Sequence, residues 1–197
     1  EPAFSPDGSK IMFQIAAGDD CLGGHKADPG IYWIPADGGV AVPLGVAGGN
    51  PRFAPDGSRV YFTTEGYADG TLITTLESIS IAGDDHRTHL RTQDSDTSEL
   101  KLSPDLEWLA YRHYQTYHVA PFDRDADESV LDATAGRQLE TAGGYELIWD
   151  RESETVYWAL GPQVFRADVS DPDDRPELLA NVNLRVPADR PEGVTAL

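Results

Sequence analysis

The stretch FSPDGSKIMF at residues 4–13 decides the fold, because it returns almost unchanged as FAPDGSRVYF at residues 53–62. A third copy, LSPDLEWLAY, begins at Leu102, and a more divergent fourth, WDRESETVYW, begins at Trp149. The first residues of the four copies lie 49, 49 and 47 residues apart, so a period near 48 residues accounts for almost all of the 197-residue chain. Repetition at such a period is typical of a protein built by stacking copies of one structural unit.

Each copy contains four short segments typical of β-strands. Runs such as KIMFQI (10–15) and RVYFTT (59–64) are rich in β-branched and aromatic residues and are bounded by Gly, Pro and Asp. A second apolar stretch follows in every copy, at 31–39, 78–85, 116–123 and 164–171, and a short segment ending on Leu44, Leu90, Leu139 or Leu179 comes after it. No segment has a helical stripe over three turns, and residues 126–139, the nearest candidate, are interpreted as a loop plus a strand.

The turn between the first two strands explains which residues the repeated motif contains. In Ser5-Pro6-Asp7-Gly8, Pro suits the second position of a type I turn, and Gly supplies the left-handed residue that closes a hairpin with a bulge. The third copy has Leu106 in the glycine position, which costs about 1 kcal/mol or more if positive φ is required there. We therefore expect a different turn at Leu106, and no turn signal remains at 151–153.

Four-stranded antiparallel units of this length are the blades of a β-propeller. The sequence predicts an all-β propeller segment of about four such blades, with an incomplete propeller left open. The predicted blades cover 1–47, 48–97, 98–143 and 144–182, and residues 183–197 are predicted to lead toward a following domain. The alternative is a β-sandwich with coincidentally similar hairpins, and the regular spacings argue against it.

The charge and composition narrow the classes of partner. The formal net charge of −19 would repel phosphate backbones and anionic lipids, so neither nucleic acid nor a membrane is expected as a partner. No apolar run approaches the roughly 20 residues that span a bilayer. The excess of Asp over Glu and of Arg over Lys fits either an acidic bacterial protein or a salt-adapted one. The chain starts without Met or a signal peptide, and we expect that the true start lies upstream.

Candidate chemical groups are few, and each has a simpler explanation. Cys21 is the only cysteine, so the chain cannot form an intrachain disulfide. We interpret Cys21 as a thiol in a loop, where His25 is the one base nearby in the sequence. The acidic run 123–128 begins like a calcium loop, but Glu128 and Thr134 replace the expected Gly and Glu. We interpret it as a surface loop, like the acidic run 168–177.

The remaining groups point to structure as well. His86 with His89, and His113 with His118, are expected to be solvated or locally bonded. All four Trp lie in or beside predicted strands, where packing between blades is expected. Neither a Gly-x-Ser-x-Gly elbow nor a phosphate loop occurs. The sequence therefore predicts no catalytic, cofactor-binding or metal-binding residue in this chain.

The repeat resembles the TolB-type propeller, in which FSPDG is followed by a KIAF-like strand and an IYWI…DGG strand. Residues 76–91, 102–122 and 147–169 are similar to the N-terminal propeller of imidazolonepropionase-like metal-dependent amidohydrolases. The end of the chain, 184–197, looks like the junction that leaves such a propeller. The family's metal-binding His-x-His has no counterpart here, so none of its catalytic residues carries over.

This resemblance implies a function that does not depend on catalytic residues in this chain. It implies a non-catalytic module of a larger bacterial hydrolase, which shapes substrate access or domain and subunit contacts. A divalent metal is implied only for the missing catalytic domain. The alternative is a stand-alone TolB-like scaffold that binds a partner protein. This chain has no catalytic motif, so whether it is part of an enzyme stays open, while the resemblance implies that the parent protein is a metal-dependent amidohydrolase. Oligomers could form through open blade edges. The resemblance alone implies a periplasmic or secreted location.

Overall fold

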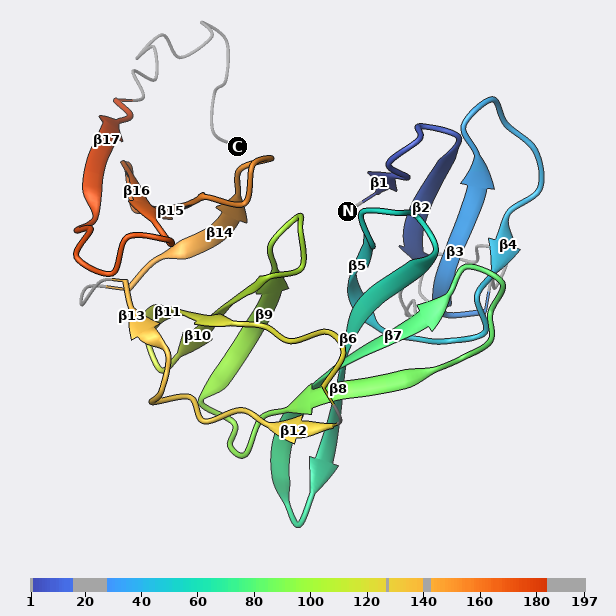
Figure 1. Ribbon diagram of the computed structural model, residues 1–197, viewed down its shortest axis with the longest axis horizontal. Helices are drawn as coiled ribbons and strands as arrows, with labels where there is room; N and C mark the ends of the chain where they lie inside the picture. The colour runs from blue at the N-terminus through green and yellow to red at the C-terminus, as the bar shows by residue number, and fades with distance from the viewer. Residues whose placement is uncertain (1, 16–27, 127, 140–142, 184–197) are drawn as a thin grey trace, which may run out of the picture.

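The computed structural model describes residues 2–15, 28–126, 128–139 and 143–183, and within these ranges it contains strands and turns but no helix. The strands form four separate sheets that follow one another around a common centre (Figure 1). This confirms the predicted all-β propeller of four blades. The predicted blade boundaries stay predictions, because 140–142 and 184–197 fall outside the described residues.

Each blade is an antiparallel sheet in which successive strands pair with their neighbours. The first blade contains β1 (Ala3–Phe4), β2 (Lys10–Ile15), β3 (Gly30–Pro35) and β4 (Val42–Pro43). The second contains β5 (Gly49–Phe53), β6 (Arg59–Ala68), β7 (Thr71–Ser80) and β8 (Arg87–Arg91). The third contains β9 (Thr97–Leu102), β10 (Trp108–His113), β11 (Thr116–Pro121) and β13 (Arg137–Gln138). The fourth contains β14 (Tyr145–Trp149), β15 (Thr155–Leu160), β16 (Gln163–Asp168) and β17 (Glu177–Asn181).

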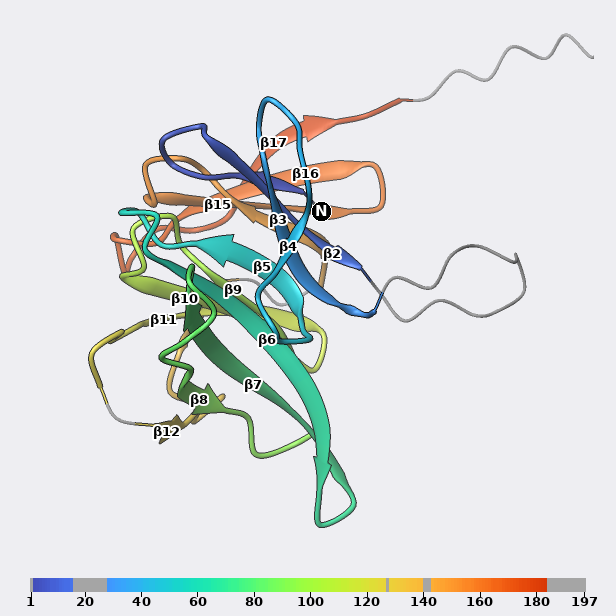
Figure 2. The same ribbon diagram turned by 90° about the vertical axis from the view of Figure 1, so that its right-hand side faces the viewer.

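Two features depart from a uniform blade. The hairpin of β6 and β7 has ten residues in each strand and projects beyond the other sheets (Figure 2). The connection between β11 and β13 forms β12 (Ser129–Val130), which pairs in parallel with β8 of the second blade. The interpretation of residues 126–139 as a loop plus a strand is thus confirmed, with β13 as the strand. In addition, β12 adds a fifth strand to the second blade and links blades two and three.

The third blade has the same hairpin turn as the first two, which corrects the expectation of a different turn at Leu106. All four blades have a residue with positive φ at this corner. Gly8, Gly57, Leu106 and Ser153 have φ of 70°, 71°, 64° and 66°. In the third blade the Leu106 amide donates to the Ser103 carbonyl at 3.1 Å, as the Gly8 amide does to Ser5 at 2.8 Å. Leu106 is only 2% exposed, and its burial offsets the cost of the left-handed conformation.

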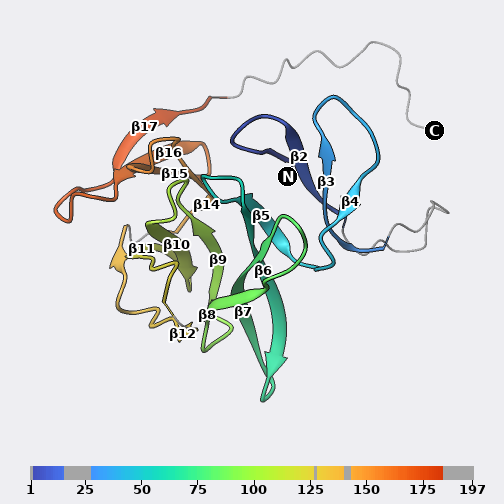
Figure 3. The same ribbon diagram turned by 45° about the vertical axis from the view of Figure 1, so that its right-hand side comes forward.

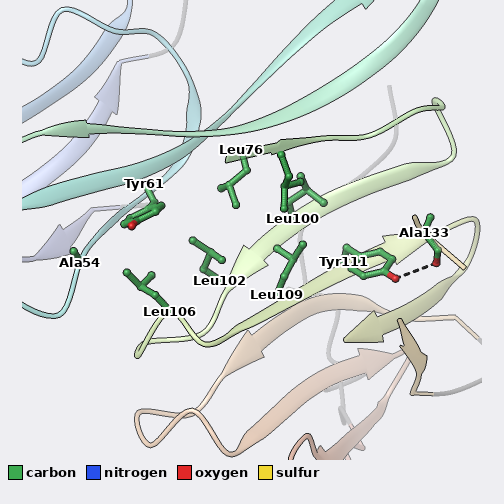
Figure 4. Close-up of a cluster of buried hydrophobic side chains, with 10 residues drawn as sticks. Ala54, Tyr61, Leu76, Leu100, Leu102, Leu106, Leu109, Tyr111 and Ala133 are labelled. Carbon is green, nitrogen blue, oxygen red and sulfur yellow. Dashed lines mark hydrogen bonds between the residues drawn. The ribbon is translucent and has the colours of Figure 1, made fainter. Parts of the chain in front are cut away.

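Buried apolar side chains lie between successive blades in three clusters. One joins blades one and two, a second joins blades two and three, and a third joins blades three and four. Figure 4 shows the second cluster, in which Tyr61 and Leu76 of one blade face Leu102 and Leu109 of the next. Among the described residues no such cluster joins the fourth blade to the first. Figure 1 shows the four blades as an open arc, with the first and fourth sheets at its two ends.

Candidate functional site

The first strands of the four blades surround a central funnel. β1, β5, β9 and β14 lie toward the middle of the arc (Figure 1), and Figure 3 shows β5, β9 and β14 from another side. These four strands line a cavity of about 560 Å³. Its lining includes the first residue of each sequence copy, namely Phe4, Phe53, Leu102 and Trp149. Pro6, Pro55 and Pro104 of the corner turns line it as well. The repeated motif therefore builds the blades and also supplies the apolar wall of their shared cavity.

Basic side chains in the funnel wall join one blade to the next. Arg52 donates from Nη1 to the Leu102 carbonyl at 2.6 Å, and Lys101 donates from Nζ to the Leu147 carbonyl at 2.8 Å. Arg52 and Lys101 occupy equivalent positions, one residue before the first residue of their sequence copies. Burial lowers the pKa of Arg52, and the nearby charge of Asp105 acts in the opposite direction. Among the described residues of the cavity lining, these are the two that carry a charge, and both are cationic.

A bulge recurs in three of these inner strands. Asn50, Glu99 and Glu146 have φ of 50°, 54° and 58° and lie three residues before the first residue of their sequence copies. The pairing of each strand with its neighbour shifts register around the same place. Bulges change the direction in which side chains point at the edges of sheets. The sequence analysis predicted none of these three bulges, although all three lie at the same distance from the repeated motif.

Glu99 shows what this change of direction achieves. Its carboxylate accepts from Arg112 Nη1 at 3.0 Å and from the Tyr117 hydroxyl at 3.0 Å. Burial raises the pKa of Tyr117, and the negative charge of Glu99 adds to this effect. The bulged residue thus ties the inner strand to the two strands behind it.

The most enzyme-like contact in the described chain is a Ser–His pair in the second blade. Ser78 Oγ lies 2.8 Å from His89 Nε2, a distance that suits a nucleophile and its base. Ser78 is 0% exposed, however, and its hydroxyl also accepts from Arg59 Nη2 at 3.0 Å. His89 stacks on Tyr61 with ring centroids 5.1 Å apart. A substrate cannot reach this hydroxyl, so the pair is part of the packing.

The other three histidines among the described residues are locally bonded, as the sequence predicted. His86 Nε2 lies 2.8 Å from a Glu77 carboxylate oxygen. His113 Nδ1 lies 2.9 Å from Thr97 Oγ1, and His118 Nε2 lies 2.9 Å from Thr116 Oγ1. The His113 and His118 rings meet edge to face with centroids 6.0 Å apart, across the hairpin of β10 and β11.

The remaining candidates contain no cluster of ligands within the part of the chain that is described. No group of three or more His, Cys, Asp or Glu side chains there could hold a metal ion. Asp123 and Asp125 are exposed, while Cys21 and His25 lie outside the described residues. The four Trp pack as predicted: Trp33 against the first interblade cluster, and Trp108, Trp149 and Trp158 in or against the third. No helix in the described ranges is long and apolar enough to cross a membrane.

Comparisons with known proteins identify the fold and leave the family open. No protein-family model matches the sequence, and no curated protein matches it. Among solved structures, a chain of the nidogen–laminin complex matches 92% of this chain with a TM-score of 0.59 at 14% identity. A protein assigned as TolB in Agrobacterium tumefaciens matches 90% with a TM-score of 0.55 at 15% identity. Prolyl oligopeptidase B of Galerina marginata matches 93% with a TM-score of 0.55 at 13% identity.

The chain spans less than two thirds of each of these neighbours. It covers 64% of the nidogen–laminin chain, 63% of the TolB chain and 29% of prolyl oligopeptidase B. At these identities the similarity defines the fold alone. The chain is a propeller scaffold, and a TolB protein is among its structural neighbours.

Proposed function

We propose that this chain is a non-catalytic scaffold that binds a peptide segment of a partner protein in its central funnel. The observation that carries the proposal is the lining of the cavity. The lining is apolar and proline-rich, and the charged side chains among its described residues, Arg52 and Lys101, are cationic in a chain of net charge −19. A concave, mostly apolar site with a few placed polar groups is the usual form of a binding site.

The charge contrast indicates the kind of segment that would fit. Cationic groups in a cavity attract negative charge, while the acidic outer surface repels acidic partners elsewhere. The segment would therefore combine apolar residues with a carboxylate. Ile148, which is 57% exposed, offers an apolar contact in the cavity wall.

Selection of random peptides displayed on phage, with the immobilised 197-residue chain as bait, tests this proposal. We expect enriched peptides with apolar and acidic residues, and binding that Ile148→Asp weakens at least tenfold. Tyr67→Asp is the matched control, because Tyr67 is 79% exposed on the β6–β7 hairpin and does not line the cavity. Peptides whose binding is insensitive to Ile148→Asp, or equally sensitive to both changes, would contradict the proposal.

The second proposal is that the chain is a module of a larger hydrolase resembling an amidohydrolase. Its support is the sequence resemblance of 76–91, 102–122 and 147–169, together with one structural precedent for a propeller in a larger enzyme. The match to prolyl oligopeptidase B uses 29% of that chain, so the same fold occurs there inside a much longer protein. A His-x-His motif in the reading frame beyond Leu197 would support this proposal, and a stop codon soon after Leu197 would refute it.

A further inference from the structure

Each blade carries one row of three paired residues on its first three strands, here called the stacking row. The register of the strands defines it, since the three residues are direct cross-strand partners. The four stacking rows are Phe4–Ile11–Ile34, Phe53–Val60–Ile79, Leu102–Leu109–Ala120 and Trp149–Val156–Ala167.

The preceding blade covers the stacking row in blades two, three and four. The row of the second blade is buried against Met12, Ile31 and Leu44 of the first blade. The row of the third packs against Tyr61, Leu76 and Leu90 of the second. The row of the fourth packs against Ala110, Tyr117 and Val119 of the third. In all three interfaces, therefore, the stacking row contacts the blade that precedes it.

The row of the first blade has no such cover among the described residues. Phe4 is 66% exposed, whereas its equivalent Phe53 is 6% exposed. Ile11 and Ile34 are only partly buried, as are Phe13 and Tyr32 on the same face, whose rings stack at 6.0 Å. A sheet face with this many apolar side chains is a site for another element.

We propose that the stacking row of the first blade docks a further four-stranded blade of the same repeat, contributed by the same polypeptide. The interface would continue the series of three that the chain already contains. The size of the nidogen–laminin chain agrees with this. Because 92% of this chain covers 64% of the nidogen–laminin chain, about 100 residues of that chain lie outside the match, the length of about two repeats.

A second copy of this chain fits the face less well. Two chains of net charge −19 repel one another. Contact between the first blade of one copy and the fourth blade of another would also be head-to-tail, and such contacts form open filaments unless the rotation closes. A blade on the same polypeptide avoids both difficulties.

Thiol labelling of the protein from the complete reading frame, alongside the 197-residue chain, tests the proposal. Both carry Phe4→Cys in a Cys21→Ser background. We expect the reading frame to encode at least one more repeat, and labelling of Phe4→Cys to be at least tenfold slower in the full protein than in the 197-residue chain. Phe53→Cys should be protected in both proteins, and Tyr67→Cys should react rapidly in both.

Three results would overturn the proposal. The first is a reading frame without a further repeat. The second is labelling of Phe4→Cys that is equally fast in both proteins. The third is protection that appears in the 197-residue chain as its concentration rises, with a doubled mass by light scattering, since this would make a second copy the occupant.

Discussion

Replacing Leu106 separates two opposing effects at the third hairpin corner. Leu106 has φ of 64° and is 2% exposed, so it combines a strained backbone with a well-packed side chain. Removing a buried Leu side chain costs about 2–5 kcal/mol. Placing Gly in the left-handed region recovers about 1–2 kcal/mol that a residue with a Cβ pays there. We therefore expect Leu106→Gly to lower the free energy of unfolding by about 2 kcal/mol.

Leu106→Ala makes the prediction sharper, because it loses the packing and keeps the strain. It should be less stable than Leu106→Gly by about 1 kcal/mol, which reverses the usual order of Ala and Gly within strands. Urea unfolding followed by Trp fluorescence measures both variants. The control is Leu109, which is buried in a strand of the same cluster, and there the Gly variant should be the less stable. A Leu106→Gly variant less stable than Leu106→Ala would refute the reasoning.

Three further predictions concern the blade interfaces. Trp149→Phe should lower the free energy of unfolding by about 1–2 kcal/mol, because it removes the 3.0 Å hydrogen bond from the indole to the Lys101 carbonyl. Trp33→Phe should cost less, since the buried Trp33 indole N–H has no hydrogen-bond partner among the described residues; chemical unfolding compares the two variants. Burial, with the charges of Arg59 and Arg87, lowers the pKa of His89 to about 4 from 6.5. The unfolded chain therefore binds a proton first, and stability should fall from about pH 6.5 to about pH 4 with a smaller slope in His89→Gln; a pH series of unfolding curves with unchanged slope would contradict this. Gly144→Ala should cost about 1–3 kcal/mol, because a Cβ there would lie 2.6 Å from Trp158 Cδ1, while Gly66→Ala has open space and should be nearly neutral; equal melting temperatures would count against the packing argument.

The hairpin turn and the spacing of the blades could be predicted from the sequence because both recur along the chain. The corner Ser5-Pro6-Asp7-Gly8 predicted both the turn and the paired strands, and the spacing predicted the number of blades. The corner at Leu106 was predicted wrongly because propensity treats each residue alone. The packing between blades, visible only in three dimensions, holds Leu106 in the conformation that Gly would otherwise supply.

The elements of the funnel were predictable only in part. The sequence showed that Phe4, Phe53, Leu102 and Trp149 are equivalent, but not that they share one cavity. The hydrogen bonds from Arg52 and Lys101 cross between blades, and the bulges depend on a register shift, so neither leaves a local pattern. The pairing of β12 with β8 likewise joins segments about 40 residues apart.

The most direct test of the account compares Phe53→Ala with Phe4→Ala in the 197-residue chain. The two residues begin copies of the same motif, but a preceding blade covers only Phe53. Stacked blades in an open arc predict that Phe53→Ala lowers the free energy of unfolding by about 3 kcal/mol or more, and Phe4→Ala by about 0.5 kcal/mol or less. Equal losses in urea unfolding would contradict the stacking of the four blades as described.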